Sequence, residues 1–487
     1  MNRLYYGDCL TIMQDMALVS VDLIYLDPPF NSNREYNAIY KDETGRPLPD
    51  QIEAFCDQWT LDDERERAIR QMPVLLREAG IDDEVTEFWR LWMNALRKTN
   101  PRLLAYLSYM VQRLLPMKGI LKPTGSIYLH CDPTASHYIK IMMDAIFGHG
   151  NFRNEIIWCY TGPGSPGMRQ FNRKHDTILW YSKGKSWTFN ADDVRLPHAG
   201  KTKANYKPGL QGSGFTGDGE PMLPTGGKVP ETWWTGIAIA ARSKSQYMRY
   251  ATQKPLALLE RIIKASSNPG DVVFDPFCGC ATTLEAAHKL GRRWIGCDIA
   301  IHAVKRVAKV RLEERLRLVE GTDFTVEGVP RNLEGARDLW ERDRYHFQKW
   351  AVEQVDGFVT TRRTGDGGID GRLYFARPGF QELRSMVIEV KGGKNVGIGT
   401  VRELAGVLKR DEADMAGLIV MDPLGQRQAA NFAREMAASG DLDVMGMMYP
   451  RMQILTAQEI LDGKRFVTPS VAARGTGQTA LPLQHSE

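Results

Sequence analysis

The segment Asp27-Pro28-Pro29-Phe30 constrains most strongly what this chain can fold into. It follows the apolar run at residues 21–26, which is typical of a buried parallel strand. Doubly wound α/β sheets bind their ligands at the carboxyl ends of such strands, so Asp27 is expected at a binding cleft. The two prolines remove backbone donors and fix the turn. The alternative is an ordinary turn, because Asp and Pro are also common in turns.

The residue types of this segment suit a flat ring that carries an amino group. Asp27 and the carbonyl of Pro28 can accept the hydrogens of an exocyclic amino group, while Phe30 stacks on the ring. An enzyme that acts on a base flipped out of DNA needs such a site. The first candidate catalytic set is therefore Asp27, Pro28, Pro29 and Phe30.

A turn of small residues at 275–283 follows an expected strand at 271–274 and opens an expected helix at 284–290. Gly279 lets the backbone approach a ligand closely, and the helix start directs N–H groups at a carboxylate or phosphate. Nineteen residues after Gly279, the next expected strand ends in Asp298. An acid at that position reaches the hydroxyl groups of a ribose. The pattern indicates a nucleoside cofactor.

Four motifs follow one another in a distinctive order: Gly7-Asp8-Cys9-Leu10, Asp27-Pro28-Pro29-Phe30, Thr252-Gln253-Lys254-Pro255 and the Asp275-Pro276-Phe277-x-Gly279 turn. Together they resemble the amino-group DNA methyltransferases of the permuted, beta-class order, in which the catalytic motif precedes the S-adenosyl-L-methionine motif. The resemblance covers residues 1–315 and implies a doubly wound Rossmann-like sheet. It also implies that the cofactor is bound by Asp8, Lys254, Pro255, Asp275, Phe277, Gly279, Thr282 and Asp298.

Two further polar residues lie near expected strand ends. By the resemblance, Asp8 accepts from the amino group of the cofactor's adenine, and it also fits the N-cap of a helix at 10–16. The two roles are compatible. His130 is expected on the pocket side, near the end of a strand at 125–132. We assign it no general-base role, because methyl transfer from a sulfonium depends largely on alignment and on polarisation of the amine.

Residues 162–236 are rich in Gly, Pro, Lys and Arg, with large aromatic residues among them that include Trp187, Phe189, Tyr206, Phe215, Trp233 and Trp234. This composition suits contact with phosphates and bases, and the resembling enzymes keep their target-recognition region here. The alternative is a disordered linker, which the aromatic residues disfavour. The initial Asp of the first motif resembles the adenine-N6 enzymes, whereas cytosine-N4 enzymes more often begin with Ser. Adenine N6 is therefore the favoured target, with cytosine N4 as the alternative.

The length of 487 residues requires two or three domains. No run of eighteen apolar residues and no signal-peptide core occurs, so a cytoplasmic protein without membrane contact is expected. The seven scattered cysteines form neither a disulfide framework nor a zinc pattern. A net charge of +4 is compatible with DNA as a partner. Residues 41–85, rich in Asp, Glu and Arg, are expected as a helical insertion that faces solvent.

A second candidate site lies near the C-terminus. The turn-rich run at 365–371 delivers Asp370, and a strand at 386–391 places Glu389 and Lys391 on one face. Two carboxylates and a lysine can bind Mg²⁺ and activate water against a phosphodiester. Residues 345–465 resemble the Mrr-type restriction endonuclease domain, a PD-(D/E)XK nuclease fold. The resemblance makes Asp370 and Glu389 the metal ligands and Lys391 the catalytic lysine, while Gln348 stands where many relatives have Glu.

The expected domain plan has a methyltransferase domain at 1–315, a helical connector at 316–344, a smaller α/β nuclease domain at 345–465 and a disordered tail at 466–487. Three functions are open. The chain is a methyltransferase and Mg²⁺-dependent endonuclease of a restriction-modification system, a methyltransferase whose nuclease-like domain only binds DNA, or a catalytically silent DNA-recognition protein. Its partner is double-stranded DNA with a flipped target base, and a homodimer or an additional restriction subunit is possible.

Overall fold

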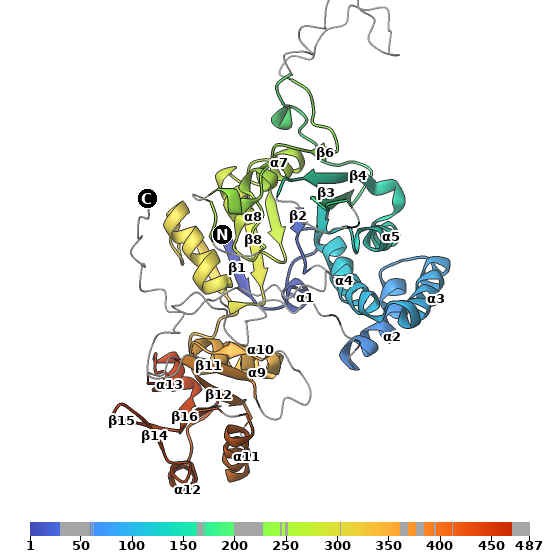
Figure 1. The fold of residues 1–487 in the computed structure, drawn as a ribbon. Coiled ribbons are helices and arrows are strands. Elements are labelled where there is room, and N and C mark those ends of the chain that lie inside the picture. The colour runs from blue at the N-terminus through green and yellow to red at the C-terminus, as the bar shows by residue number, and fades with distance from the viewer. Residues whose placement is uncertain are drawn as a thin grey trace, which may run out of the picture. The chain divides into compact units, whose positions relative to one another are not determined.

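The computed structural model describes residues 1–29, 59, 61, 63–162, 169, 171–198, 227–243, 246–248, 252–301, 303–360, 369–375, 384–393, 396–411 and 413–469. Phe30, much of the expected target-recognition region and residues 470–487 of the expected tail lie outside these ranges. The chain divides into two compact units. The first comprises Met1–Arg34, Asp57–Asp298 and Val307–Thr325, and the second comprises the remainder. The two units are described separately (Figure 1).

The first unit is built on a nine-stranded sheet with the order β6-β4-β5-β3-β2-β7-β8-β1-β9. Strands β3, β2, β7, β8 and β1 are parallel to one another, and β5 is antiparallel to β3 and β4. The doubly wound fold and its closing hairpin are therefore confirmed. The strand bounds are β1 Asn2–Tyr6, β2 Val21–Leu26, β3 Leu121–Cys131, β4 Phe152–Cys159, β5 His175–Ser182, β6 Trp233–Trp234, β7 Val272–Asp275, β8 Arg293–Asp298 and β9 Phe324–Glu327.

Helices pack on both faces of this sheet because its strands are apolar on both sides. Val21, Ile24 and Leu26 of β2 join one core with α1 to α5, while Leu23 and Tyr25 are buried outside that cluster. Figure 1 labels α4 and α5 near β3, and α8 near β8. The helix bounds are α1 Cys9–Gln14, α2 Asp63–Glu78, α3 Asp83–Thr99, α4 Pro101–Ile120, α5 Ser136–Phe147, α7 Leu256–Ser266 and α8 Thr282–Lys289.

One segment of the first unit differs from expectation. The prediction that residues 41–85 face solvent is wrong for α2, because its residues Ala68, Ile69, Met72 and Leu76 are buried. Farther along the chain, Ala303–Ala308 and Arg311–Arg315 form π-helical turns. Such turns are rare and shift side chains relative to an α-helix.

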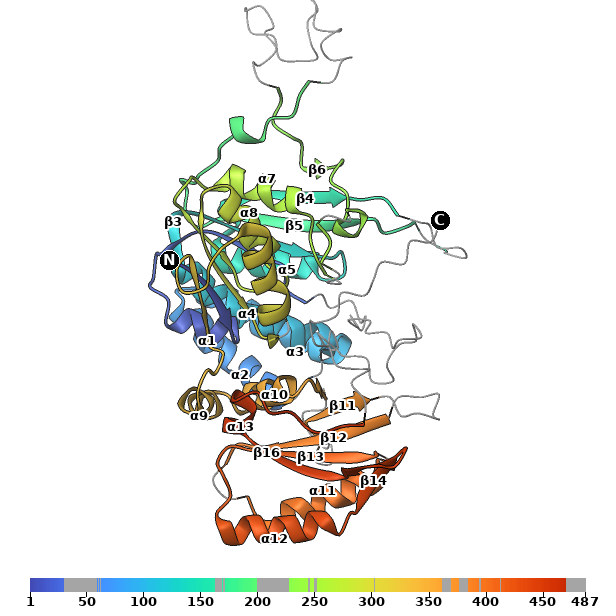
Figure 2. The same ribbon diagram turned by 90° about the vertical axis from the view of Figure 1, so that its left-hand side faces the viewer.

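The second unit is a five-stranded sheet with the order β10-β11-β12-β13-β16. β12, β13 and β16 are parallel to one another, whereas β11 is antiparallel to both of its neighbours, β10 and β12. Figure 2 shows α10 on one face of this sheet and α11 and α12 on the other. The bounds are β10 Phe358–Val359, β11 Gly371–Phe375, β12 Arg384–Lys391, β13 Met415–Val420, β16 Met452–Thr456, α10 Arg344–Gln354, α11 Ile398–Arg410 and α12 Gln426–Ala437.

The segment expected as a helical connector contains β9 as well as α9 Leu333–Arg342. α9 and α10 are separated at Asp343, whose carboxylate accepts from His346 N at 3.0 Å and caps α10. A hairpin of β14 Asp441–Val444 and β15 Met447–Pro450, and the short helix α13 Ala457–Leu461, were not predicted. Among the described helices, none combines the length and apolar character needed to cross a membrane.

Candidate functional site

Asp27 lies at the carboxyl end of β2, as the sequence predicts. Its side chain is 13% exposed, and its Oδ2 accepts from Lys254 Nζ at 2.6 Å. Its Oδ1 is buried and has no hydrogen-bond partner within the described part of the chain. The carboxylate is therefore held through one oxygen, and the other is an acceptor without a donor.

The second strand end brings Asp275 to the same edge of the sheet. β7 pairs with β2 in parallel, with Leu23 opposite Val273 and Ile24 opposite Phe274. Asp275 Oδ1 accepts from Phe277 N at 3.0 Å, which closes the turn. Burial raises the pKa of the Asp275 carboxyl to about 7, and the charge of Asp27 adds to the increase. Two of the predicted acids thus influence each other electrostatically.

The small-residue turn after β7 is tied to the end of β8. Gly279, in the left-handed region with φ 47°, donates its N–H to Asp298 Oδ2 at 2.9 Å. Cys278 N donates to Cys297 O at 2.9 Å. Ala281 is also left-handed, with φ 59°. The structure therefore brings Gly279 and Asp298 together, as the expected cofactor site requires.

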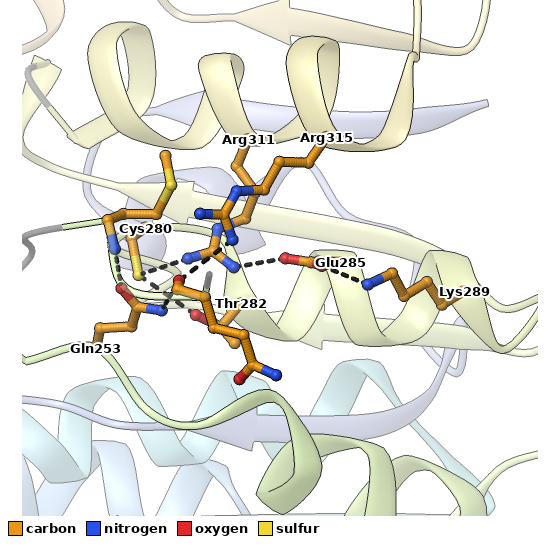
Figure 3. A network of polar contacts seen from close by, with 9 residues as sticks. Gln253, Cys280, Thr282, Glu285, Lys289, Arg311 and Arg315 are labelled. Atoms are coloured by element: carbon orange, nitrogen blue, oxygen red, sulfur yellow. Dashed lines mark hydrogen bonds and ion pairs between the residues drawn. The ribbon is translucent and has the colours of Figure 1, made fainter. Parts of the chain in front are cut away.

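A buried polar network supports this turn from the helix side (Figure 3). Arg311 is fully buried and donates to Glu285 Oε2 at 2.5 Å, and Lys289 donates to Glu285 Oε1 at 2.6 Å. Arg311 also lies 3.7 Å from Cys280 Sγ, which in turn lies 3.3 Å from the Thr282 hydroxyl. Thr282 thus lies at the start of α8, beside the turn. Sequence reasoning missed Arg311 and Glu285, because neither belongs to a motif.

The Gln253 side chain orders the segment before α7 in the same view. Its Oε1 accepts from Met248 N at 2.8 Å, and its Nε2 donates to Gln246 O at 2.7 Å. Arg315 also donates to Gln246 O, at 3.2 Å. Pro255 is the N-cap residue of α7. This arrangement fixes Lys254, which the sequence assigns to the cofactor, beside Asp27.

Asp8 caps α1 by accepting from Leu10 N at 2.8 Å, which confirms the capping role. Its other oxygen pairs with Arg113, whose guanidinium is buried and lies 3.4 Å from the ring centre of Tyr109. The ring of Phe277 also lies near Tyr109, with ring centres 6.4 Å apart. Gly7 N donates to Asp298 O at 3.0 Å. Asp8, Phe277 and Asp298 therefore gather around one region, and Arg113 is a member that the sequence did not indicate.

The second predicted site is assembled at the ends of β11 and β12. Asp370 Oδ2 accepts from Val390 N at 2.7 Å, and Lys391 Nζ lies 2.7 Å from Glu389 Oε1. Burial lowers the pKa of Lys391, but the bond to Glu389 and the charges of Glu389 and Asp370 outweigh it, so the net shift is upward. All three predicted residues therefore lie within interaction range of one another.

Two carboxylates of this kind fit a hard divalent cation, which prefers oxygen ligands and retains several waters. Within the described residues, no group of three or more His, Cys, Asp or Glu side chains is arranged to hold a metal. Residues 361–368, which include Asp366, lie outside those ranges. Asp370 and Glu389 are the protein oxygen donors that this part of the site offers.

Comparison with known proteins gives two matches to family models. A model described as DNA methylase matches residues 21–309, and one described as restriction endonuclease matches residues 336–444. The type II methyltransferase M.EcaI of Enterobacter cloacae is 30% identical over an alignment of 258 positions, which covers 42% of this chain and 57% of that protein. M1.MboII of Moraxella bovis is 36% identical over 153 residues, covering 30% and 58%.

A third relative, the DNA adenine methyltransferase YhdJ of Escherichia coli, is 25% identical over 302 residues, which are 62% of this chain and 79% of that protein. The chain spans just over half the length of the first two relatives. The two family-model matches cover the parts of the chain that carry Asp27 and Asp370.

The glycine that follows Asp370 gives a test of the second site's packing. A Cβ on Gly371 would lie 2.8 Å from Phe358 O and 2.4 Å from Val352 Cγ1. Overpacking of this kind costs about 1–3 kcal/mol. We therefore expect Gly371→Ala to lower the free energy of unfolding of the second unit by that amount, measured by urea unfolding.

Gly399→Ala is the matched control, because Gly399 lies in α11 and an added Cβ there meets nothing within 4 Å. Alanine at that helical position is expected to raise stability by up to about 1 kcal/mol. A Gly371→Ala protein that unfolds at the same urea concentration as the wild type would show that the close approach is not required.

Proposed function

Because the chain belongs to the DNA methylase family, whose model matches residues 21–309, we propose that it transfers a methyl group from S-adenosyl-L-methionine to a base amino group in double-stranded DNA. The observation that carries this proposal is Asp27 Oδ1, a buried acceptor without a donor within the described residues. Leaving such a group unsatisfied costs about 1–3 kcal/mol. The amino group of a flipped base supplies the missing donor.

Asp27 and Pro28 act on this amine by orienting it. When its hydrogens donate to Asp27 Oδ1 and to the Pro28 carbonyl, the nitrogen lone pair is directed away from both. S-adenosyl-L-methionine, when bound, supplies an electrophilic methyl group. The lone pair would form the new N–C bond as the C–S bond of the cofactor breaks and its electrons remain on sulfur, and one of the amine's own protons would pass to water. Pro29 holds the turn, and Phe30 remains the proposed stacking residue.

The turn after β7 supports a place for the cofactor. Gly279 has a positive φ and donates to Asp298, so backbone and acid lie together at a helix start. Tyr109 and Phe277 add an aromatic side to this region. The residues that we propose to hold the cofactor are Asp8, Pro255, Asp275, Phe277, Gly279, Thr282 and Asp298.

For the base, we propose adenine N6, because the motif begins with an acid. One relative is a DNA adenine methyltransferase, which is in keeping with this choice. Cytosine N4 remains the second candidate, since the same two acceptors serve either amino group.

For the second unit, we propose Mg²⁺-dependent cleavage of DNA. Asp370 and Glu389 would hold the cation, which when bound lowers the pKa of a water molecule and stabilises charge on the phosphate. Lys391, already 2.7 Å from Glu389, would face the phosphodiester. The alternative is that this unit only binds DNA. A homodimer or an additional restriction subunit also remains a prediction.

The methyl-transfer role of Asp27 is tested by Asp27→Asn. An amide keeps the shape of the side chain but presents one acceptor and loses the charge. We expect methyl transfer to fall by about 10²-fold or more, while affinity for S-adenosyl-L-methionine changes by less than about threefold. Tritium transfer to DNA and calorimetric titration of the cofactor measure the two quantities.

Asp132→Asn is the control, because Asp132 follows the neighbouring strand β3 and its carboxylate bonds within its own turn, to Thr134. It should keep wild-type activity. Cofactor binding lost in parallel with activity in Asp27→Asn would show that the site assignment is wrong.

The base is identified by chromatography of nucleosides from DNA labelled with tritiated cofactor. Genomic DNA from a host that lacks this protein supplies all sequences at once. We expect the label in N6-methyladenine, because an Asp begins the first motif. Label in N4-methylcytosine would show that cytosine N4 is the target and not adenine N6, and it would leave the proposed role of Asp27 unchanged.

Cleavage is tested on supercoiled plasmid with Mg²⁺. Wild-type protein is expected to nick or linearise unmethylated DNA, and removal of the metal by EDTA should stop the reaction. Asp370→Ala should abolish cleavage, since it removes one of the two carboxylates that we propose as metal ligands. The control is Asp441→Ala, at an exposed position of β14. Unaltered cleavage by Asp370→Ala would contradict the assignment, whereas no cleavage by any form would favour a DNA-binding role.

A further inference from the structure

Lys254 is buried against a carboxylate that lies far from it in the sequence. Its side chain is 11% exposed, and its ammonium lies 2.6 Å from Asp27 Oδ2. Long charged side chains are seldom buried unless they are paired, and pairing immobilises a flexible stem. This contact therefore fixes the orientation of the Asp27 carboxylate and leaves Oδ1 as the oxygen without a donor among the described residues.

A second carboxylate lies near the same ammonium. Asp176 lies at the start of β5, which is antiparallel to β3, so it meets the carboxyl end of β3 at the edge where Asp27 lies. Burial raises the pKa of Asp176, but its hydrogen bonds to His130 and Tyr160 and the charge of Lys254 outweigh burial, so the net shift is downward. Lys254 thus interacts with Asp27 and with Asp176.

Asp176 is itself held by buried groups. Its Oδ2 lies 2.9 Å from His130 Nε2, and its Oδ1 accepts from the Tyr160 hydroxyl at 3.1 Å. His130 is fully buried, and its Nδ1 lies 2.9 Å from the Tyr25 hydroxyl. A proton on Nε2 lets His130 donate to Asp176 and accept from Tyr25, so both contacts are satisfied.

The hydrogen-bonded series Tyr25–His130–Asp176 therefore begins on β2, the strand that ends at Asp27. It ends at Asp176, which interacts with Lys254, the partner of Asp27. Tyr25 and Asp27 are two residues apart on β2 and its end. Buried polar groups that are fully satisfied are rigid, and they fix one arrangement among several. A polar cluster with a merely structural role would not need to lead, through Lys254, to Asp27, the carboxylate proposed to bind substrate.

We propose that Lys254 is a positioning residue for methyl transfer, held against Asp27 by the Asp176–His130–Tyr25 network, and is not a ligand of the cofactor. This inference rests on the proposed function of Asp27. Lys254 occupies Oδ2, so that Oδ1 meets the amino group in one orientation. His130 acts through Asp176 and never contacts the substrate.

The test uses Lys254→Met, which removes the charge and keeps a long side chain, and Lys254→Arg, which keeps the charge. A misplaced reacting group costs about 10²-fold in rate. We expect Lys254→Met to lower kcat by about that factor, with the KM for DNA and the Kd for S-adenosyl-L-methionine changed by less than about threefold. Lys254→Arg should recover kcat to within about tenfold of the wild type. Asp176→Asn should lower kcat by about tenfold with the same unchanged Kd.

Lys122→Met is the matched control. Lys122 Nζ lies 2.8 Å from Asp22 Oδ1 in the amino-terminal part of β2. Lys122→Met therefore removes a Lys–Asp pair at the end of the strand away from Asp27. It should keep the wild-type kcat. A fall in kcat equal to that of Lys254→Met would attribute the effect to lost stability of β2 and overturn the inference.

The double variant Asp27→Asn/Lys254→Met separates this inference from the function on which it rests. If Lys254 acts through Asp27, the double variant is no slower than Asp27→Asn alone. Independent, multiplying losses would overturn the positioning role, as would a Kd for the cofactor that rises as kcat falls. Wild-type kcat in Lys254→Met, with Asp27→Asn inactive, would overturn this inference alone. A fully active Asp27→Asn would overturn the proposed function itself.

Discussion

The parallel pairing of β2 with β7 and of β7 with β8 is the constraint on which the first unit's chemistry depends. In register, these strands end at one edge of the sheet, and each delivers an acid there: Asp27, Asp275 and Asp298. Carboxyl ends of parallel strands present open backbone and side chains to a cleft, whereas the strand interiors are filled by core residues. The order of the motifs along the chain is therefore less important than their convergence in space. The second unit uses a different arrangement, because β11 and β12 are antiparallel: the start of β11, next to Asp370, meets the carboxyl half of β12, which carries Glu389.

Electrostatics explains why such a concentration of acids is tolerated. Asp27 has an ammonium at 2.6 Å, Asp298 accepts a backbone N–H, and burial raises the pKa of Asp275 to about 7. A buried charge without a partner is energetically costly. Each of the three acids avoids that cost in a different way. In the second unit, the charge of Glu389 is offset by Lys391. Removing one member of any of these pairs leaves the other buried without its partner, at the full free-energy cost of its desolvation. To separate positioning from binding, a site therefore needs two variants, one that conserves the charge of the side chain and one that conserves its shape.

Much of the fold followed from local signals. Apolar runs punctuated by Pro and Gly located β2, β7 and β8, and the order of the motifs gave the permuted arrangement. The contacts that define the site were not predictable in this way. Lys254 meets Asp27 across 227 positions, and Arg311 reaches Glu285 from a π-helical turn whose register a helical pattern does not reveal. β9 and the β14–β15 hairpin were missed because four-residue strands carry too little periodicity. The buried face of α2 was hidden by its many charged residues.

The central claim is that Asp27 receives the amino group of an extruded base through the oxygen that Lys254 leaves unbound. Its most direct test is a crystal structure of the chain with duplex DNA and a non-reactive analogue of S-adenosyl-L-methionine. The account predicts a flipped base whose amino nitrogen lies about 2.9 Å from Asp27 Oδ1, with Lys254 still on Oδ2. A flipped base whose amino group bonds elsewhere, with Asp27 facing away from it, would contradict the account.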